Sequence, residues 1–267
     1  MAFESLGIES VIIVAILVGA VAFFYSNLGL GGGQLYVPIM VLLFTTLYMR
    51  EIVPLSLCFA FVTMLSATYT HSRKGLVDFR LGSMLAAGGL AGVLAGVMFT
   101  TSVEDRIAKI GFVILLLIVA TKMMYDLYRA KKENTVCPMV FSLKCRLAGV
   151  GVSILTGFLI GSFGIGGGVV SVPLIIYVFR FETRKAIGTS AFMGAILTPA
   201  AFAAYAFQEG VSINYDLVLV LTPIVFVMGL IGSTWGLKKL KTKVVRAIFT
   251  GGVYLAACGM IYSLLFH

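Results

Sequence analysis

Two glycine-rich segments have the residue pattern best suited to hold a ligand. They read Asn27-Leu-Gly-Leu-Gly-Gly-Gly-Gln-Leu-Tyr-Val-Pro38 and Ser162-Phe-Gly-Ile-Gly-Gly-Gly-Val-Val-Ser-Val-Pro173. Consecutive glycines have no Cβ atoms to keep a ligand away from the backbone. A helix that starts after such a triplet directs its unpaired N–H groups back toward it. These donors, together with the partial positive charge of a helix start, are suited to bind an anion.

We therefore expect a site for a small oxyanion that needs no fixed cation. Polar side chains near the triplets supply further hydrogen-bond donors, at Asn27, Gln34, Ser162 and Ser171. The backbone part of the predicted site consists of the glycines of both segments: Gly29, Gly31, Gly32, Gly33, Gly164, Gly166, Gly167 and Gly168. Glycines can instead serve only to let helices pack closely, and we adopt that interpretation for Gly88, Gly92 and Gly96.

The two segments also mark an internal repeat. With small gaps, the correspondence continues through the pairs Arg50/Arg184, Ser56/Ser190, Gly75/Gly210, Gly92/Gly229, Lys109/Arg246 and Met123/Met260. The sequence therefore predicts a first transmembrane repeat over residues 1–129, a polar linker over 130–145 and a second transmembrane repeat over 146–267.

The composition excludes a soluble globular protein. Of 267 residues, 60% are hydrophobic, and only 20 Lys and Arg and 11 Asp and Glu are present. A soluble domain of this length carries about 65 charged residues. Uncharged stretches reach the ~20 residues that cross a bilayer, and none alternates as the strands of a transmembrane β-barrel do. We expect an all-α polytopic membrane protein with ten apolar segments, at 10–28, 34–48, 52–71, 81–103, 107–128, 146–163, 169–179, 186–207, 217–237 and 246–266.

Basic residues indicate whether the chain reverses at each glycine triplet. With a reversal, each repeat has five segments, and the two repeats are inverted relative to each other. Sixteen Lys and Arg residues then face one side of the membrane, and three face the other: Arg50, Arg106 and Lys109. Without a reversal, eight of these Lys and Arg residues face one side of the membrane and eleven face the other. The positive-inside rule favours the reversal, with the linker in the cytosol and both termini outside.

Each repeat is thus predicted to open with a hairpin that is broken by glycine. The second arm is short, about 22 Å for 34–48 and about 16 Å for 169–179, against a hydrocarbon core of about 30 Å. Both glycine turns should then lie at membrane depth, where irregular backbone is found only in the protein interior or beside a watery cavity. Interrupted segments at matching positions in two inverted repeats are typical of a transporter's binding site.

The motifs resemble those of the TauE/SafE family of bacterial sulfite and organosulfonate exporters. The resemblance rests on both glycine motifs and on His71 shortly before Gly75 and Asp78, and it covers almost the whole chain. It implies a sulfur-containing oxyanion as the substrate and the bacterial cytoplasmic (inner) membrane as the location.

The resemblance also implies two polar substrate contacts. The second repeat reads Gly188-Thr-Ser190, which is closer to the family pattern than Pro54-Leu-Ser56 in the first. We therefore assign substrate contacts to Thr189 and Ser190 rather than to Ser56. Tyr205 stands where the second repeat would match His71, which departs from the pattern.

Export by alternating access is the function that we expect. An anion that leaves a negative interior gains about 2.3 kcal/mol per charge per 100 mV, and no carboxylate lies deep in a segment. Uptake of a sulfur anion and an anion channel remain alternatives.

The apolar segments contain no cluster of His, Cys and carboxylate residues and no nucleotide-binding motif. We therefore expect no enzyme, cofactor, metal or nucleic-acid partner; the expected partners are the small anion and the bilayer, and the oligomeric state stays open.

Several polar residues have both a structural and a functional interpretation. His71 is suited to be a proton site or simply ends its segment. Lys122 and Asp126 are four residues apart and are expected to pair. No basic residue precedes the first apolar segment, so we expect it to be retained rather than cleaved as a signal peptide. The cysteines are expected to be reduced thiols: Cys58, Cys137, Cys145 and Cys258.

Overall fold

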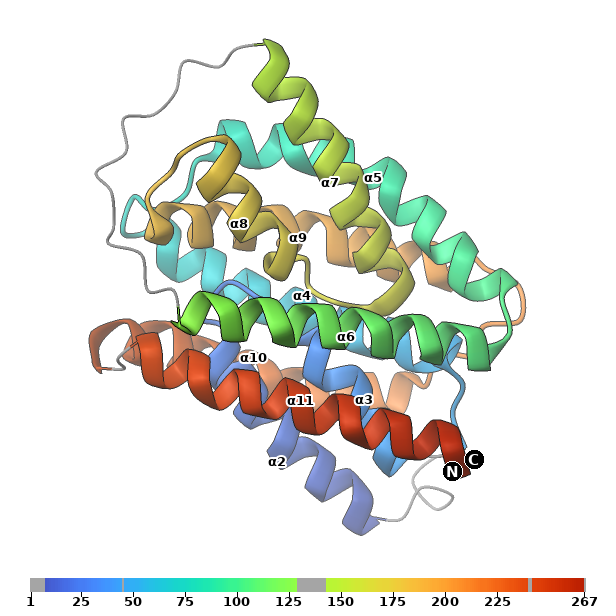
Figure 1. Cartoon of the computed structure of the whole chain (residues 1–267). Coiled ribbons are helices and arrows are strands. Elements are labelled where there is room, and N and C mark those ends of the chain that lie inside the picture. Colours follow the sequence, from blue (N-terminus) through green and yellow to red (C-terminus); the bar gives the residue numbers. More distant parts are fainter. Residues whose placement is uncertain (1–7, 45, 129–142, 240–241, 267) are drawn as a thin grey trace.

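A computed structural model describes the backbone of residues 8–44, 46–128, 143–239 and 242–266, with side chains for 9–44, 46–125, 146–235 and 250–264. Over these residues the chain forms α-helices and no strand (Figure 1), which confirms the predicted all-α fold. The linker expected at 130–145 falls almost entirely outside the described residues, as do the side chains of Cys137 and Cys145. The helices are α2 (Ile8–Tyr25), α3 (Gly33–Leu43), α4 (Met49–Ser72), α5 (Phe79–Ser102), α6 (Asp105–Tyr128), α7 (Leu143–Phe163), α8 (Gly168–Val178), α9 (Thr183–Ala206), α10 (Tyr215–Lys239) and α11 (Thr242–Phe266).

Each predicted apolar segment corresponds to one helix. The largest difference concerns 34–48, because α3 already ends at Leu43. The next helix starts at Met49, where the backbone N–H of Tyr48 donates to the Glu51 carboxylate at 3.0 Å. This capping box fixes the start of α4, so the preceding residues have to form the connection instead of continuing α3.

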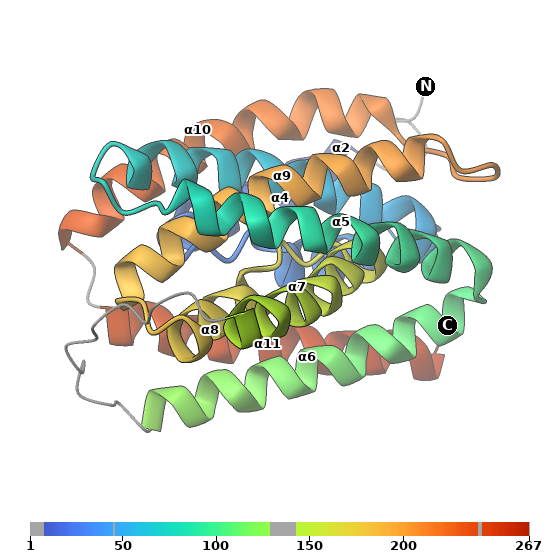
Figure 2. The ribbon, with the colours of Figure 1, turned by 90° about the horizontal axis from the view of Figure 1, so that it is seen from above.

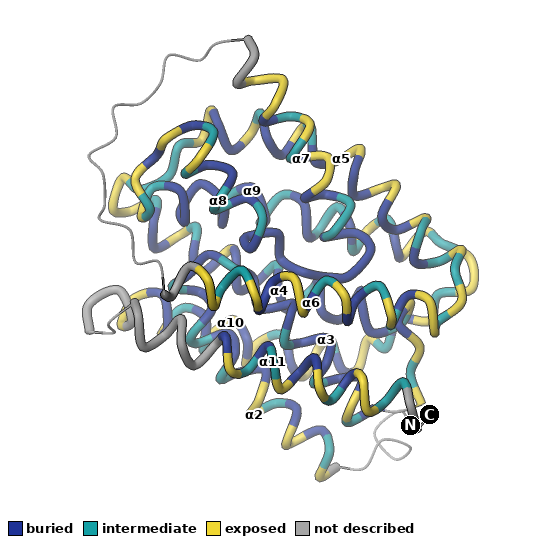
Figure 3. Tube along the Cα trace, viewed as in Figure 1, coloured by how far each residue is buried: buried dark blue, intermediate teal, exposed yellow. Residues whose placement is uncertain are grey.

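Over the residues with described side chains, six helices are long and apolar enough to cross a membrane: α4, α5, α6, α7, α9 and α10. With 11 residues each, α3 and α8 are too short to cross. Large apolar side chains on the outer helix faces are exposed, such as Ile16 at 67%, Leu219 at 73% and Leu255 at 76% (Figure 3). These faces suit a lipid environment, in which apolar side chains do not have to be buried in protein.

The helices pack in matching pairs around α4 and α9, the two most buried of the six long helices. Helix α5 packs against α7 and α9. Helix α10 packs in the corresponding way against α2 and α4. Helices α6 and α11 lie side by side along another face, as Figures 1 and 2 show. The glycine-rich connections between α2 and α3 and between α7 and α8 lie inside this arrangement and are almost entirely buried.

Glycines form the seam between α5 and α7, as the packing interpretation requires. A Cβ atom added at Gly92 would overlap the Ile154 carbonyl, and one at Gly96 would overlap the Phe158 carbonyl. The two backbones can approach this closely because these positions carry no side chain. Gly92 and Gly96 are therefore structural residues of the helix interface.

Candidate functional site

The two glycine segments meet each other in the interior of the protein. A Cβ atom on Gly31 would lie 2.6 Å from the Cα of Gly166, and one on Gly166 would lie 2.5 Å from the Cα of Gly31. The contacts are reciprocal on either side of this pair. A Cβ on Gly33 would overlap the Gly164 carbonyl, and a Cβ on Gly168 would overlap the Gly29 carbonyl.

Glycine is also the residue that caps the helix after each segment. Gly32 precedes α3 with φ 84°, and Gly167 precedes α8 with φ 79°. L-residues with a side chain rarely adopt this left-handed conformation. Neither cap provides a side-chain hydrogen bond to the helix. The first N–H groups of both helices therefore donate to no capping side chain, unlike those of a helix with a Ser, Thr, Asp or Asn cap.

Asn27 has the clearest unsatisfied hydrogen-bonding capacity beside the glycines. Both polar atoms of its amide are buried and have no hydrogen-bond partner among the described residues. Gln34, which is fully buried, has its amide next to the Tyr25 hydroxyl. Buried amides normally find partners. Both polar atoms of the Gln34 amide likewise meet no partner within hydrogen-bond limits among the described residues, so Asn27 and Gln34 are the predicted site residues with free capacity for a ligand.

The predicted polar residues of the second repeat divide into two groups. The hydroxyl oxygens of Ser171 and Ser190 lie 2.6 Å apart, and Ser171 also donates to the Gly167 carbonyl at 3.0 Å. These two serines are therefore together at the second glycine segment. The Ser162 hydroxyl instead donates to the Gly96 carbonyl at 3.2 Å, so this side chain faces α5.

Thr189 and His71 belong to a different cluster, at the end of α4. The Thr189 hydroxyl accepts the backbone N–H of Asp78 at 3.0 Å, and the Asp78 carboxylate lies 3.7 Å from the Lys185 ammonium. Nδ1 of His71 lies 2.8 Å from the Ala67 carbonyl, and a Cβ on Gly188 would lie 3.0 Å from the Cβ of His71. The geometry gives Thr189 a role in joining α9 to the α4–α5 connection.

Ser56 also lies at the site, although the sequence favoured Thr189 and Ser190 over it as substrate contacts. It is fully buried, and its hydroxyl donates to the Gly164 carbonyl at 3.1 Å. The signal that could have identified it was its correspondence to Ser190 in the repeat. Both serines lie against the second glycine segment, one from each repeat.

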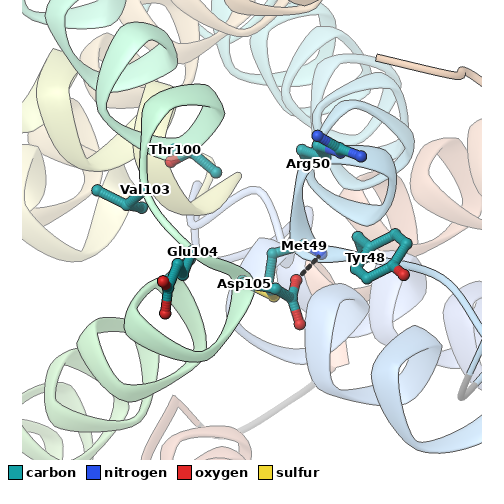
Figure 4. A pocket seen from close by; sticks show the side chains of 8 residues that line it. Tyr48, Met49, Arg50, Thr100, Val103, Glu104 and Asp105 are labelled. Atoms are coloured by element: carbon teal, nitrogen blue, oxygen red, sulfur yellow. Dashed lines mark hydrogen bonds between the residues drawn. The ribbon is translucent and has the colours of Figure 1, made fainter. Parts of the chain in front are cut away.

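Two cavities lie near opposite ends of α6. The larger, which we call the Arg50 cavity, has a volume of about 310 Å³ and is shown in Figure 4. Of its two acidic residues, Asp105 accepts the backbone N–H of Met49 at 2.5 Å and pairs with Lys109 at 2.7 Å. Its wall residue Thr100 donates to the Ser162 carbonyl at 2.7 Å. The cavity is lined by Tyr48, Met49, Arg50, Thr100, Val103, Glu104, Asp105 and Ala108.

The smaller cavity lies directly beside the glycine segments. We call it the Lys122 cavity; it has a volume of about 90 Å³. Its walls come from the first glycine segment, from α6, from the start of α8 and from α9. The residues are Leu28, Leu30, Lys122, Met123, Gly168, Val169, Val172, Pro173 and Ile187. Among the described residues, no group of three or more His, Cys, Asp or Glu side chains is placed to hold a metal ion.

Comparisons with known proteins identify membrane transporters that are similar to this chain. The probable membrane transporter protein YunE of Bacillus subtilis is 25% identical over 259 residues, which cover 90% of this chain and 93% of that protein. A probable membrane transporter protein of Haemophilus influenzae is 28% identical over 193 residues, covering 70% of each chain. Another from Methanocaldococcus jannaschii is 25% identical over 227 residues, covering 82% of this chain and 80% of its own. No solved structure gives a significant match.

A family match covers nearly all of the described helices. The model of the family described as sulfite exporter TauE/SafE matches residues 12–260. This range includes both glycine segments and the helices that pack around them. The relatives are named as transporters rather than as enzymes. The chain therefore belongs to the TauE/SafE sulfite exporter family and is a multi-pass membrane transporter.

Proposed function

We propose that this transporter exports a small sulfur-containing oxyanion, sulfite or an organosulfonate, by alternating access around the paired glycine segments. The observation that carries the proposal is the reciprocal contact between Gly31 and Gly166, which brings two glycine-capped helix starts to one place. Two helix starts provide backbone donors and partial positive charge for one anion. The family name supports a sulfur anion as the substrate.

In this proposal the anion is held by backbone N–H groups and by a few uncharged side chains. Asn27 has free hydrogen-bonding capacity, and Ser171 and Ser190 lie at the second segment. Ser56 is added to the site because its hydroxyl contacts Gly164. Thr189 and Ser162 contribute through the backbone that they position rather than through direct contact. No cofactor is needed for such binding.

We further propose that the chain consists of two inverted repeats, residues 1–129 and 146–267, each of which opens with a glycine-broken hairpin. The pairing of helices supports this symmetry. If the two repeats are exchanged, the packed pair α5 and α7 corresponds to the packed pair α10 and α2. In the same way, the pair α5 and α9 corresponds to the pair α10 and α4. The basic residues support a cytosolic linker at 130–145, both termini outside and a location in the bacterial inner membrane.

Binding and flux of named anions test the proposal. Purified protein should gain thermal stability with sulfite, sulfoacetate or taurine, because a ligand that binds only the folded state stabilises it by mass action. The same anion should leave protein-containing liposomes in a saturable manner, whereas empty liposomes should retain it. Current that grows linearly with concentration would indicate a channel instead. If none of the sulfur anions stabilises the protein or moves, the proposed substrate class is wrong.

A further inference from the structure

Helices α6 and α11 correspond in the repeat but pack differently on the short helices. α11 packs closely against α3, where a Cβ added at Gly259 would lie 2.7 Å from a methyl group of Leu42. By the proposed symmetry α6 should pack in the same way against α8. Over the described residues it makes no comparable contact with α8. The Lys122 cavity occupies this place, between Met123 of α6 and Val172 of α8.

The residue that differs at this place is Lys122. Met123 corresponds to Met260, so Lys122 stands where the second repeat has Gly259. A glycine allows α11 to approach α3, whereas a lysine side chain keeps α6 away from α8 and lines the space between them. A small contact residue of the second repeat thus corresponds to a cation of the first repeat, at a position of α6 that lines the cavity beside the glycine segments.

The position of this lysine within the span is also unusual. Lys122 lies inside the apolar span Asp105–Tyr125, about 9 Å before the end of α6 at Tyr128. Charged side chains within membrane spans are costly, and they commonly face water-filled cavities and mark the pathway of an ion or substrate. Lys122 is the charged residue among those that line this cavity.

We propose that the Lys122 cavity is the cytosolic entry site for the anion, and that it prefers organosulfonates to inorganic sulfite. The ammonium group of Lys122 binds the sulfonate head, which then lies beside the start of α8 at Gly168. The carbon chain contacts the apolar walls at Leu28, Val172 and Ile187. Apolar walls with few polar groups favour ligands that have an apolar part. This inference rests on the proposed function and names the substrate class and the entry residue of the same site.

A cysteine on the opposite wall can test the charge preference of the cavity. Val172→Cys places a thiol among the lining residues. The parent protein, which has cysteines of its own, gives the background rate of labelling. Two thiol reagents of similar size should be compared, the sulfonatoethyl and the trimethylammonioethyl methanethiosulfonates. We expect the anionic reagent to react faster when applied from the cytosolic side. Ethanesulfonate should bind the unlabelled parent protein more tightly than sulfite in titration calorimetry, which is used for this comparison because sulfite itself cleaves methanethiosulfonates.

Removing the lysine charge should abolish this preference. In Val172→Cys/Lys122→Met the ratio of anionic to cationic rates should fall roughly tenfold or more, since a hydrogen bond to a charged group exceeds a tenfold effect on binding. Lys122→Arg should keep the ratio. Lys109→Met is the matched control, because it removes the same charge from α6 at a residue that pairs with Asp105. Lys122→Gln replaces Lys122→Met if the latter fails to purify as a monodisperse protein.

The outcomes separate this inference from the proposed function. If Val172→Cys does not react, shows no charge preference or keeps its preference without Lys122, the entry site is wrong even where sulfur anions are transported. If ethanesulfonate binds no more tightly than sulfite, the preference for organosulfonates is wrong. If the charge preference depends on Lys122 but no sulfur anion is transported, the cavity is an anion site and the proposed transport function is wrong.

Discussion

Gly31 and Gly166 are in backbone contact, so that a single methyl group on either would fall within 2.6 Å of the other's Cα atom. These residues are 135 positions apart in the sequence and hold matching positions in the two glycine motifs. The contact leaves no room for a side chain on either residue. The segments therefore behave as one structural unit, and a change in either one should affect the site as a whole.

Alanine at a helix-capping glycine should damage anion binding more than folding. A Cβ on Gly167 would approach the end of the flexible Ile160 side chain at 2.6 Å, with φ at 79°. A left-handed conformation costs a residue with a side chain roughly 1–2 kcal/mol. We expect Gly167→Ala to purify with a modestly lower melting temperature and to lose most binding of sulfite or sulfoacetate, as measured by thermal shift and direct binding. Gly32→Ala should behave similarly.

Gly168→Ala should be more damaging than Gly167→Ala, because its Cβ would overlap the Gly29 carbonyl rather than a movable side chain. Gly151→Ala in α7 is the suitable control, since a Cβ there meets no atom within 4 Å. Gly92 is unsuitable, because its Cβ would overlap the Ile154 carbonyl. Parental affinity in both Gly32→Ala and Gly167→Ala would show that the triplets serve packing alone.

The Ser171–Ser190 pair should contribute to binding at the second segment. Removing one neutral hydrogen bond costs about 0.5–1.5 kcal/mol, so Ser190→Ala should weaken anion binding about 2- to 10-fold. Ser153→Ala is the matched control, because this buried serine of α7 donates only to the Val150 carbonyl at 2.8 Å. Equal affinities for Ser190→Ala and Ser153→Ala, measured by titration calorimetry, would exclude Ser190 from the site.

Hydropathy, with the two glycine motifs counted as breaks, was sufficient to predict each described helix, because the length of a membrane-spanning apolar segment is set by the bilayer. The boundary that was missed, at Leu43, depends on a capping interaction between Tyr48 and Glu51. The residues between Leu43 and Tyr48 are all uncharged, so hydropathy does not mark the end of α3. The segments alone therefore give the number of helices but not all of their ends.

The directions of side chains could not be read from the motifs. Ser162 and Ser171 belong to one motif, yet one faces the Gly96 carbonyl on α5 and the other faces Ser190. Which way a side chain points depends on the rotation of its helix and on its neighbours, and both are set by packing of distant segments. The sequence predicted only a local pair between Lys122 and Asp126, whose side chain lies outside the described residues, whereas the structure places Lys122 on the wall of a cavity.

The inverted arrangement predicts opposite exposure for two corresponding loop residues. Lys74 and Glu209 each precede a glycine with positive φ, Gly75 and Gly210, and both are exposed. In inverted repeats these loops lie on opposite sides of the membrane. We expect a membrane-impermeant thiol reagent to label Lys74→Cys only from the cytosol and Glu209→Cys only from outside. Labelling of both from the same side would rule out the inverted repeats.

The membrane potential should drive export without a coupled cation. In liposomes loaded with sulfoacetate or sulfite, an interior-negative potential should accelerate efflux in the absence of proton or sodium gradients. At 100 mV the gain of about 2.3 kcal/mol per charge corresponds to roughly a fiftyfold ratio of concentrations for a monovalent anion. Efflux measured at several potassium diffusion potentials checks this dependence. The opposite result, efflux that does not depend on voltage and follows a pH gradient, would indicate proton coupling.

His71 would then be the first residue to change, because its ring is buried beside Gly188 and its Nδ1 lies 2.8 Å from the Ala67 carbonyl. In that case His71→Gln should abolish the pH dependence, while Gly151→Ala should retain it.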